Sequence, residues 1–362
     1  ENSDKTPYEQ LREINARARS YGLKTLVDLV ISHSASDSKL LVEHPEWYKW
    51  ESPGKVHHPF CHEDGKKVVW RDLAKFDPEK SKDREGLLEF FFEGINYLLE
   101  SGFSGFRCDA AYQIPRWVWE RLIRRTKKVN KETVFLAETL GCTAEQTRET
   151  AKAGFDYIFN SSKWWDYHDT WMMAQYNLTR DIAPSISFPE SHDTDRLSNE
   201  LDGNVDGIKQ RYLFSSLFSS AVMMPVGYEF GFKKRVHVVH TKPGEEERGD
   251  IDISGFIQEV NRIKGTYSVF CEEAPTEILQ SNNPNVLLMW KGSVCSSEEA
   301  LLILNKDIYS KQHFYSENVY NYVQARAPLK DVSPEFPLDF IPEPYSYDLR
   351  PGQGIVLITR RD

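Results

Sequence analysis

Apolar, β-rich stretches alternate with amphipathic helical stretches through most of this 362-residue chain. Strands are predicted over 25–31, 103–108, 133–137, 155–159, 185–189 and 222–226. Helices are predicted over 7–21, 87–99, 116–129, 143–153, 205–219 and 256–264. Strands that alternate with helices at this spacing predict βαβ units and therefore a parallel sheet.

The strand count leaves two architectures open. A closed (β/α)₈ barrel has eight strands, whereas this pattern supplies six and begins with a helix. The chain therefore forms either an open sheet or a barrel that lacks its first two strands and the helix between them. In the second case, we expect an N-terminal segment or a second chain to complete the barrel.

The pattern changes after about residue 275, where no long helix is predicted. The runs 286–290, 300–304 and 354–359 read as strands of an antiparallel β-sandwich domain. We therefore predict a catalytic α/β domain over 1–270, with an irregular insertion over 33–85, and a β-sandwich domain over 271–362.

Composition excludes several classes of protein. A net charge of −10 argues against a nucleic-acid binder, which needs a basic surface. No apolar run is long enough to be a membrane span. Five cysteines without CxxC spacing suggest neither a zinc site nor a disulfide framework, and ENSDKTPYEQ does not look like a signal peptide. We therefore expect a cytoplasmic protein.

Three acids follow three of the predicted strands, at the edge where parallel α/β folds place their active sites. They are Asp109 in GFRCDAA, Glu138 in VFLAETLG and Asp193 in FPESHDTDR. One acid at a strand end is often only a structural hydrogen-bond acceptor. Three acids at the ends of three such strands, with histidines nearby, indicate carboxylate chemistry.

Four segments in order resemble the signature regions of glycoside hydrolase family 13, the α-amylase clan. They are VDLVISH (27–33), GFRCDAA (105–111), FLAETL (135–140) and FPESHD (188–193). The resemblance covers about residues 7–230 and implies a TIM-type barrel that lacks its first two strands here. VEHPEWYKW (42–50) and RWVWERL (116–122) are also similar to bacterial α-1,4-glucan maltosyltransferases that use maltose 1-phosphate, and this match is partial.

The resemblance implies a role for each matching residue. Asp109 would be the nucleophile, Glu138 the acid/base and Asp193 the third carboxylate of a retaining mechanism. Arg107 lies two residues before Asp109 and therefore on the same face of the strand. The substrate-binding residues would be Arg107, Asp28, His33 and His192.

Two further expectations concern ligands. Trp164 and Trp165, in the loop NSSKWWDYHDTWMMAQY, offer aromatic faces for outer glucose units, although packing explains them equally well. We expect no cofactor and no metal. Ser32 stands where the family often has a calcium-binding Asn, and serine is a poor calcium ligand, so a calcium site is doubtful.

The predicted function is a retaining glycosidase that cleaves α-1,4-glucosidic bonds, with an α-glucan or malto-oligosaccharide as its substrate. One alternative is a glucanotransferase or maltosyltransferase that uses the same intermediate. A second is a glucan-binding homologue without catalysis. The intact set Asp109, Glu138, Asp193 and Arg107 argues against it, because a binding protein does not need all four. A third, weaker alternative is an isomerase of a disaccharide link, which its product would identify.

Overall fold

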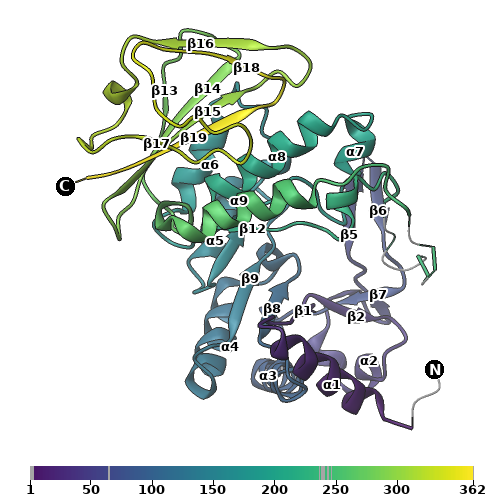
Figure 1. Cartoon of the computed structure of the whole chain (residues 1–362). Helices are drawn as coiled ribbons and strands as arrows, with labels where there is room; N and C mark the ends of the chain where they lie inside the picture. Colours follow the sequence, from purple (N-terminus) through teal and green to yellow (C-terminus); the bar gives the residue numbers. More distant parts are fainter. Residues whose placement is uncertain are drawn as a thin grey trace. The chain divides into compact units, whose positions relative to one another are not determined.

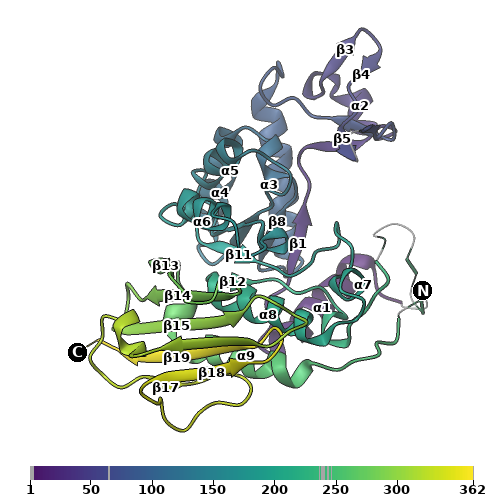
Figure 2. The same ribbon diagram turned by 90° about the horizontal axis from the view of Figure 1, so that it is seen from above.

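A computed structural model describes residues 4–63, 66–235, 237, 241–242, 244–245 and 247–361. The chain divides into two compact units, Glu1–Phe159 and Asn160–Asp362. Figures 1 and 2 show their elements from two directions. The predicted boundary between 270 and 271 stays a prediction.

The first unit is built on a parallel sheet with the order β1, β8, β9 and β10. These strands are Leu26–Leu29, Gly105–Cys108, Val134–Ala137 and Tyr157–Phe159, each inside a predicted run. The helices α1 (Pro7–Ser20), α3 (Arg84–Glu100), α4 (Arg116–Val129) and α5 (Ala144–Ala151) are also those predicted. Capping boxes at Thr6 and Thr143 fix the starts of α1 and α5, because each side chain accepts a backbone N–H that the helix leaves unpaired.

The insertion is more regular than the sequence predicted. It forms three antiparallel pairs: β2 (His33–Ala35) with β7 (Leu73–Lys75), β3 (Trp50–Ser52) with β4 (Lys55–Val56), and β5 (Phe60–Glu63) with β6 (Lys66–Val69). A short helix, α2 (Lys39–Glu43), lies between β2 and β3 in the chain. These pieces lie among Pro, Gly, His and Trp residues and are not part of the apolar runs that marked the parallel strands in the sequence.

The second unit contains two parallel strands that pair with each other, β11 (Ser185–Ser187) and β12 (Ala221–Val222). Its helices are α6 (Trp171–Thr179), α7 (Leu197–Glu200), α8 (Val205–Phe218) and α9 (Ser254–Thr266). Residues 160–176 were expected to form a loop. This expectation is wrong from Trp171 onward, where the chain forms α6. Most of α8 is buried, and its buried residues include polar Gln210, Ser215 and Ser216 as well as the apolar ones.

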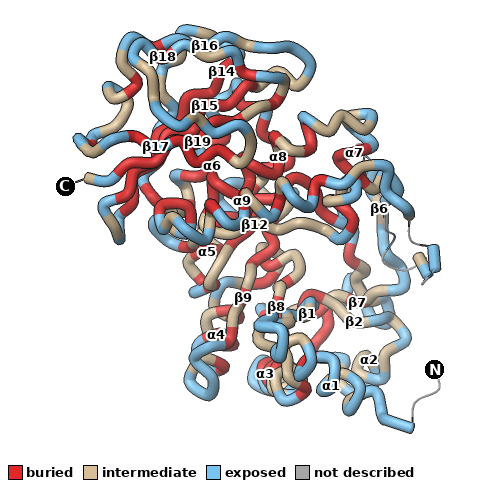
Figure 3. Tube along the Cα trace, in the orientation of Figure 1, coloured by how far each residue is buried: buried red, intermediate tan, exposed pale blue. Residues whose placement is uncertain are grey.

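The C-terminal strands form a five-stranded antiparallel sheet in the order β13, β14, β15, β19 and β17. Their bounds are Thr276–Leu279, Val286–Gly292, Glu298–Asn305, Gly354–Arg360 and Lys330–Asp331, and a separate pair joins β16 (Gln312–Ser316) to β18 (Tyr345–Leu349). Side chains on a strand alternate between faces. Leu287, Met289 and Leu302 therefore join the core of α8 and α9, whereas Leu288, Leu301 and Ile303 pack with β16 and β18. The central strands β14, β15 and β19 are buried along nearly their whole length, as their red colour in Figure 3 shows.

Two further expectations can be compared with the described residues. Within these ranges, no helix combines the length and apolar character needed to span a bilayer. Cys108, Cys142, Cys271 and Cys295 are free thiols, and the side chain of Cys61 lies outside the described residues.

Candidate active site

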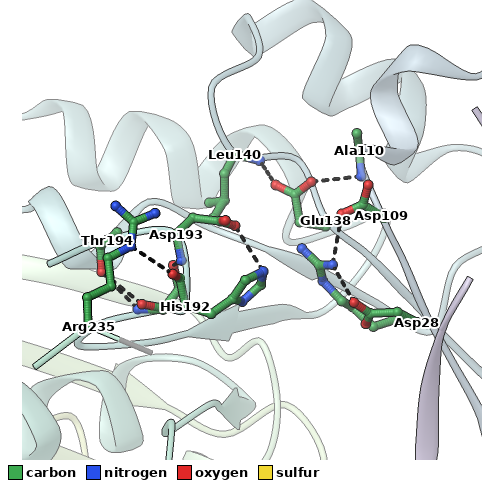
Figure 4. Close-up of polar contacts among 11 residues, drawn as sticks. Asp28, Asp109, Ala110, Glu138, Leu140, His192, Asp193, Thr194 and Arg235 are labelled. Carbon is green, nitrogen blue, oxygen red and sulfur yellow. Dashed lines mark hydrogen bonds and ion pairs between the residues drawn. The ribbon is translucent and has the colours of Figure 1, made fainter. Parts of the chain in front are cut away.

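Arg107 joins two acids of the first unit. Its Nη1 lies 3.0 Å from Oδ2 of Asp28 and 2.8 Å from Oδ1 of Asp109 (Figure 4). The neighbouring strands β1 and β8 pair Asp28 with Arg107 in register, and Asp109 follows β8 on the same face as Arg107. The guanidinium is largely buried and permanently charged. It therefore holds the Asp109 carboxylate by a short ion pair and fixes its direction.

Glu138 follows β9 and is held by backbone N–H groups on both oxygens. Ala110 donates to Oε2 at 2.8 Å, and Leu140 donates to Oε1 (Figure 4). The side chain is only 7% exposed. Burial raises the pKa of Glu138 above its usual value, and it outweighs the hydrogen bond from Leu140 and the charge of Arg107, which lower it. A carboxyl in this setting can hold a proton at a higher pH than an ordinary glutamate.

The loops after β8 and β9 are tied together through their backbones. Glu138 donates its N–H to the carbonyl of Cys108, and Ala111 donates to the carbonyl of Glu138, both at 3.0 Å. Ala110 adopts a left-handed conformation with φ of 41°, which residues with a side chain adopt rarely. Sequence reasoning missed Ala110 and Leu140, because they act through main-chain N–H groups that every non-proline residue carries.

His33 begins β2, on the insertion of the first unit. Its Nδ1 lies 2.9 Å from the hydroxyl of Ser32. Burial lowers the pKa of His33, and this effect exceeds that of the negative charge of Asp109, which raises it. The imidazole is therefore set to be neutral at pH 7, with one nitrogen able to donate a hydrogen bond and the other able to accept one.

His192 and Asp193 lie together on a turn of the second unit. Nε2 of His192 is 3.2 Å from Oδ2 of Asp193, and both side chains are exposed (Figure 4). The turn is held by Ser191, whose hydroxyl accepts the N–H of Asp193 at 3.2 Å. Arg235 donates from Nε to the carbonyl of His192 at 3.2 Å. Each unit thus brings together its own share of the predicted site residues.

A buried ion pair joins the two residues that flank this turn, Glu190 and Arg196. Nη1 of Arg196 lies 3.0 Å from Oε1 of Glu190, with the two side chains 3% and 1% exposed. Glu190 also accepts the N–H of Leu197 at 2.6 Å, and Arg196 donates to the carbonyl of Val226 at 2.8 Å. The pair therefore fixes both ends of the segment that carries His192 and Asp193.

Replacing Arg196 by Met is expected to destabilise the protein by about 3–5 kcal/mol, because the charge of Glu190 would stay buried without its partner. Urea unfolding followed by tryptophan fluorescence measures this loss. The matched control is Arg262→Met, which breaks an exposed pair with Glu259 and should change stability by less than about 1 kcal/mol. Equal, small losses in both variants would contradict the structural role of the Glu190–Arg196 pair.

The two tryptophans predicted to bind sugar differ. Trp165 is fully buried and packs against Phe218 and Phe214, so its predicted role as an exposed sugar platform is corrected to one in the core. The ring packs against α8, which is far away in the sequence, and burial of this large apolar group is favourable. Trp164 is 51% exposed, and its role in binding stays a prediction.

In the parts of the chain that the structure describes, no group of three or more His, Cys, Asp or Glu side chains is arranged to hold a metal ion. The expectations of no cofactor and of a doubtful calcium site stay predictions.

Comparisons with known proteins were made by sequence and by structure. No family model matches the chain. It is 22% identical over 313 residues to an α-1,4-glucan:maltose-1-phosphate maltosyltransferase of Burkholderia pseudomallei, a match over 82% of this chain and 27% of that protein. It is 24% identical to the enzyme of the same name from Methylacidiphilum infernorum, over 86% of this chain and 48% of that protein. The chain thus spans between about a quarter and a half of these curated relatives.

Solved structures of α-amylases match the fold of this chain. An α-amylase from H. orenii matches 98% of this chain and 84% of its own, with a TM-score of 0.76 and 14% identity. An α-amylase from Geobacillus thermoleovorans matches 98% and 81%, with a TM-score of 0.75 and 14% identity. This likeness confirms the fold class, a TIM-type barrel with a C-terminal antiparallel β domain, although the strand pairs of the described residues do not close the barrel. Together with the sequence relatives, it confirms the predicted resemblance to glycoside hydrolase family 13.

Proposed function

We propose that this chain, which resembles glycoside hydrolase family 13, is a retaining enzyme that cleaves α-1,4-glucosidic bonds through a covalent glycosyl-enzyme intermediate. The observation that carries the proposal is the arrangement around Arg107. One carboxylate, Asp109, is held against a fixed cation, and a second, Glu138, is buried with a raised pKa. A carboxylate fixed in direction to act as nucleophile, with a buried carboxyl of raised pKa to act as acid, is what retaining glycoside hydrolysis requires.

In the first step, Asp109 attacks the anomeric carbon and forms a bond to it as the glycosidic C–O bond breaks. Glu138 gives its proton to the departing oxygen, so the leaving sugar departs as a neutral alcohol. In the second step, Glu138 takes a proton from a water molecule, whose oxygen attacks the same carbon and releases Asp109. Two inversions leave the α configuration unchanged.

The remaining predicted residues would hold the sugar. Asp193 offers an exposed carboxylate for ring hydroxyls, and His192 beside it can donate a hydrogen bond. His33 is neutral and can do the same from the first unit. Exposed Trp164 would stack on a more distant glucose unit.

Transfer to a second sugar is the alternative outcome, and it uses the same residues. The relatives named as maltosyltransferases favour it. Water and a sugar hydroxyl compete for one intermediate, so the choice depends on the residues that admit the acceptor. An α-glucan or malto-oligosaccharide as substrate and a cytoplasmic location are part of this proposal.

Proton NMR of maltoheptaose incubated with the protein tests the proposal, with Asp109→Ala as the control. New α-anomeric reducing ends indicate a retaining hydrolase. Longer and shorter chains without new reducing ends indicate a transferase. Identical spectra for both proteins would overturn the proposal that this chain cleaves glucans by itself.

The raised pKa of Glu138 predicts the pH dependence. Because the acid must be protonated to act, kcat/KM should fall as pH rises through the pKa of Glu138, which burial places above the ordinary glutamate value. The measurement is kcat/KM for maltotriose between about pH 4 and 9. An alkaline limb centred at the usual pKa of glutamate, near 4.5, would contradict the effect of burial.

A further inference from the structure

The second unit contains a cavity that none of the proposed catalytic residues lines. Its volume is about 140 Å³, and it lies between α8 and the turn that joins β18 to β19. The turn approaches α8 closely, since a Cβ placed on Gly352 would lie 2.7 Å from the carbonyl oxygen of Asp206. The cavity walls are therefore fixed by backbone contacts and not only by side chains.

Phe336 lies at this cavity in a conformation that the fold does not favour. Its φ is 54°, in the left-handed region where a bulky residue is a rare outlier, and its side chain is 52% exposed. A glycine or an asparagine would adopt the same backbone with less strain. Burial does not explain strain at this residue, because about half of its surface is exposed to solvent. Such outliers concentrate where a side chain is held for a ligand.

Charged groups surround this ring in a fixed arrangement. The guanidinium of Arg350 lies 3.8 Å from the centre of the Phe336 ring. Lys209 forms an ion pair with Glu335 at 2.6 Å, and its ammonium lies 5.2 Å from the ring of Phe256. Asp206 and Gln353 also line the cavity. Aromatic rings with carboxylate, guanidinium and amide groups around them can contact both the apolar C–H face of a sugar and its hydroxyls.

The charges in the lining also indicate which ligands fit. Two cations, Lys209 and Arg350, are matched by two anions, Asp206 and Glu335, so the site carries no net formal charge. A phosphate or another small anion would face two carboxylates, and a cation would face two basic groups. A neutral ligand rich in hydroxyl groups can donate to the carboxylates and accept from the basic groups at once.

We propose that the cavity beside Phe336 is a second carbohydrate-binding site, which takes a glucose unit of an α-glucan at a place separate from the catalytic carboxylates. The identity of the sugar rests on the proposed function. The site would hold polymeric substrate on the protein and would take no part in the chemistry.

Retardation of the protein in native gels that contain amylose tests the site, with Asp109→Ala as the parent so that no glucan is consumed. Replacing Phe336 by Gly in this parent should weaken amylose affinity about tenfold or more, as expected for loss of an aromatic anchor. Its melting temperature should stay within about 3 °C of the parent, because glycine relieves the positive φ. The matched control is Phe340→Ala, which removes a 73% exposed aromatic residue outside the cavity and should leave retardation unchanged.

Phe336→Asn is the second variant, since asparagine also tolerates the left-handed backbone. Unchanged retardation in a folded Phe336→Gly or Phe336→Asn protein, or no retardation of the parent, overturns the second site. Equal losses in Phe336→Gly and Phe340→Ala overturn it as well, because the effect would not be specific to the cavity.

The second carbohydrate-binding site and the proposed function can each be overturned without the other. In the background with Asp109 intact, Phe336→Gly should cleave maltotriose at the parental rate and lose activity on amylose at low substrate concentration. Retardation that depends on Phe336 in a protein without maltotriose cleavage would support the second site and overturn the proposed function. Cleavage of maltotriose by a protein whose retardation does not depend on Phe336 would support the proposed function and overturn the second site.

Discussion

Replacing Asp109 by Asn is expected to lower kcat/KM for malto-oligosaccharides by about 10⁴-fold or more, because the amide cannot form the covalent intermediate. The side chain keeps its size and can still accept a hydrogen bond from Arg107 through its oxygen. The folded structure should therefore survive, so the loss would report chemistry rather than unfolding. Initial rates on maltotriose measure it.

A matched control and a direct readout accompany this variant. Asp181→Asn changes an exposed aspartate whose nearest cation is 3.7 Å away, and it should retain parental activity. Intact-mass spectrometry with a 2-deoxy-2-fluoro maltosyl fluoride should show one covalent sugar adduct on the parent and none on Asp109→Asn. Substantial activity, or an adduct, in the Asp109→Asn protein would exclude Asp109 as the nucleophile.

Replacing Glu138 by Gln is expected to slow the cleavage of a substrate only where its leaving group needs a proton. Cleavage of maltotriose should fall by about 10³-fold or more, because the departing sugar oxygen needs the proton that Glu138 supplies. Release of fluoride from α-maltosyl fluoride should continue in the first turnover, since fluoride leaves without protonation. The second step would then be slow for lack of a base, and a burst of fluoride would reveal the accumulated intermediate.

Azide provides the confirming experiment for Glu138→Gln. Azide is an anionic nucleophile and needs no general base. It should therefore restore the turnover of α-maltosyl fluoride by the Glu138→Gln protein and yield an α-glycosyl azide. The variant also has a structural effect, because the amide NH₂ would face the N–H of either Ala110 or Leu140, which now donate to the two carboxylate oxygens. One lost acceptor should cost about 1–3 kcal/mol of stability. Equal losses on maltotriose and on the fluoride would argue against an acid/base role.

The sequence alone determined the long helices and the apolar runs that contain the short parallel strands. The six strand runs and the six helix patterns were recognisable because burial on one face imposes a period of 3.6 residues on helices, and burial of strands requires apolar β-rich runs. The acids Asp109 and Glu138 were found in the same way. Each follows a buried strand that can be identified, and chain connectivity places the ends of parallel strands at one edge of the sheet.

Only the tertiary structure decided which groups surround those acids and which aromatic residues are exposed. The donors to Glu138 are backbone N–H groups of Ala110 and Leu140, whose direction depends on φ and ψ rather than on residue type. Trp164 and Trp165 are identical neighbours in sequence, yet one is exposed and the other fills the core. Phe336 and Arg350 meet only because the chain folds back between them. Exposure and contact depend on segments far apart in sequence, and no local pattern of residues encodes them.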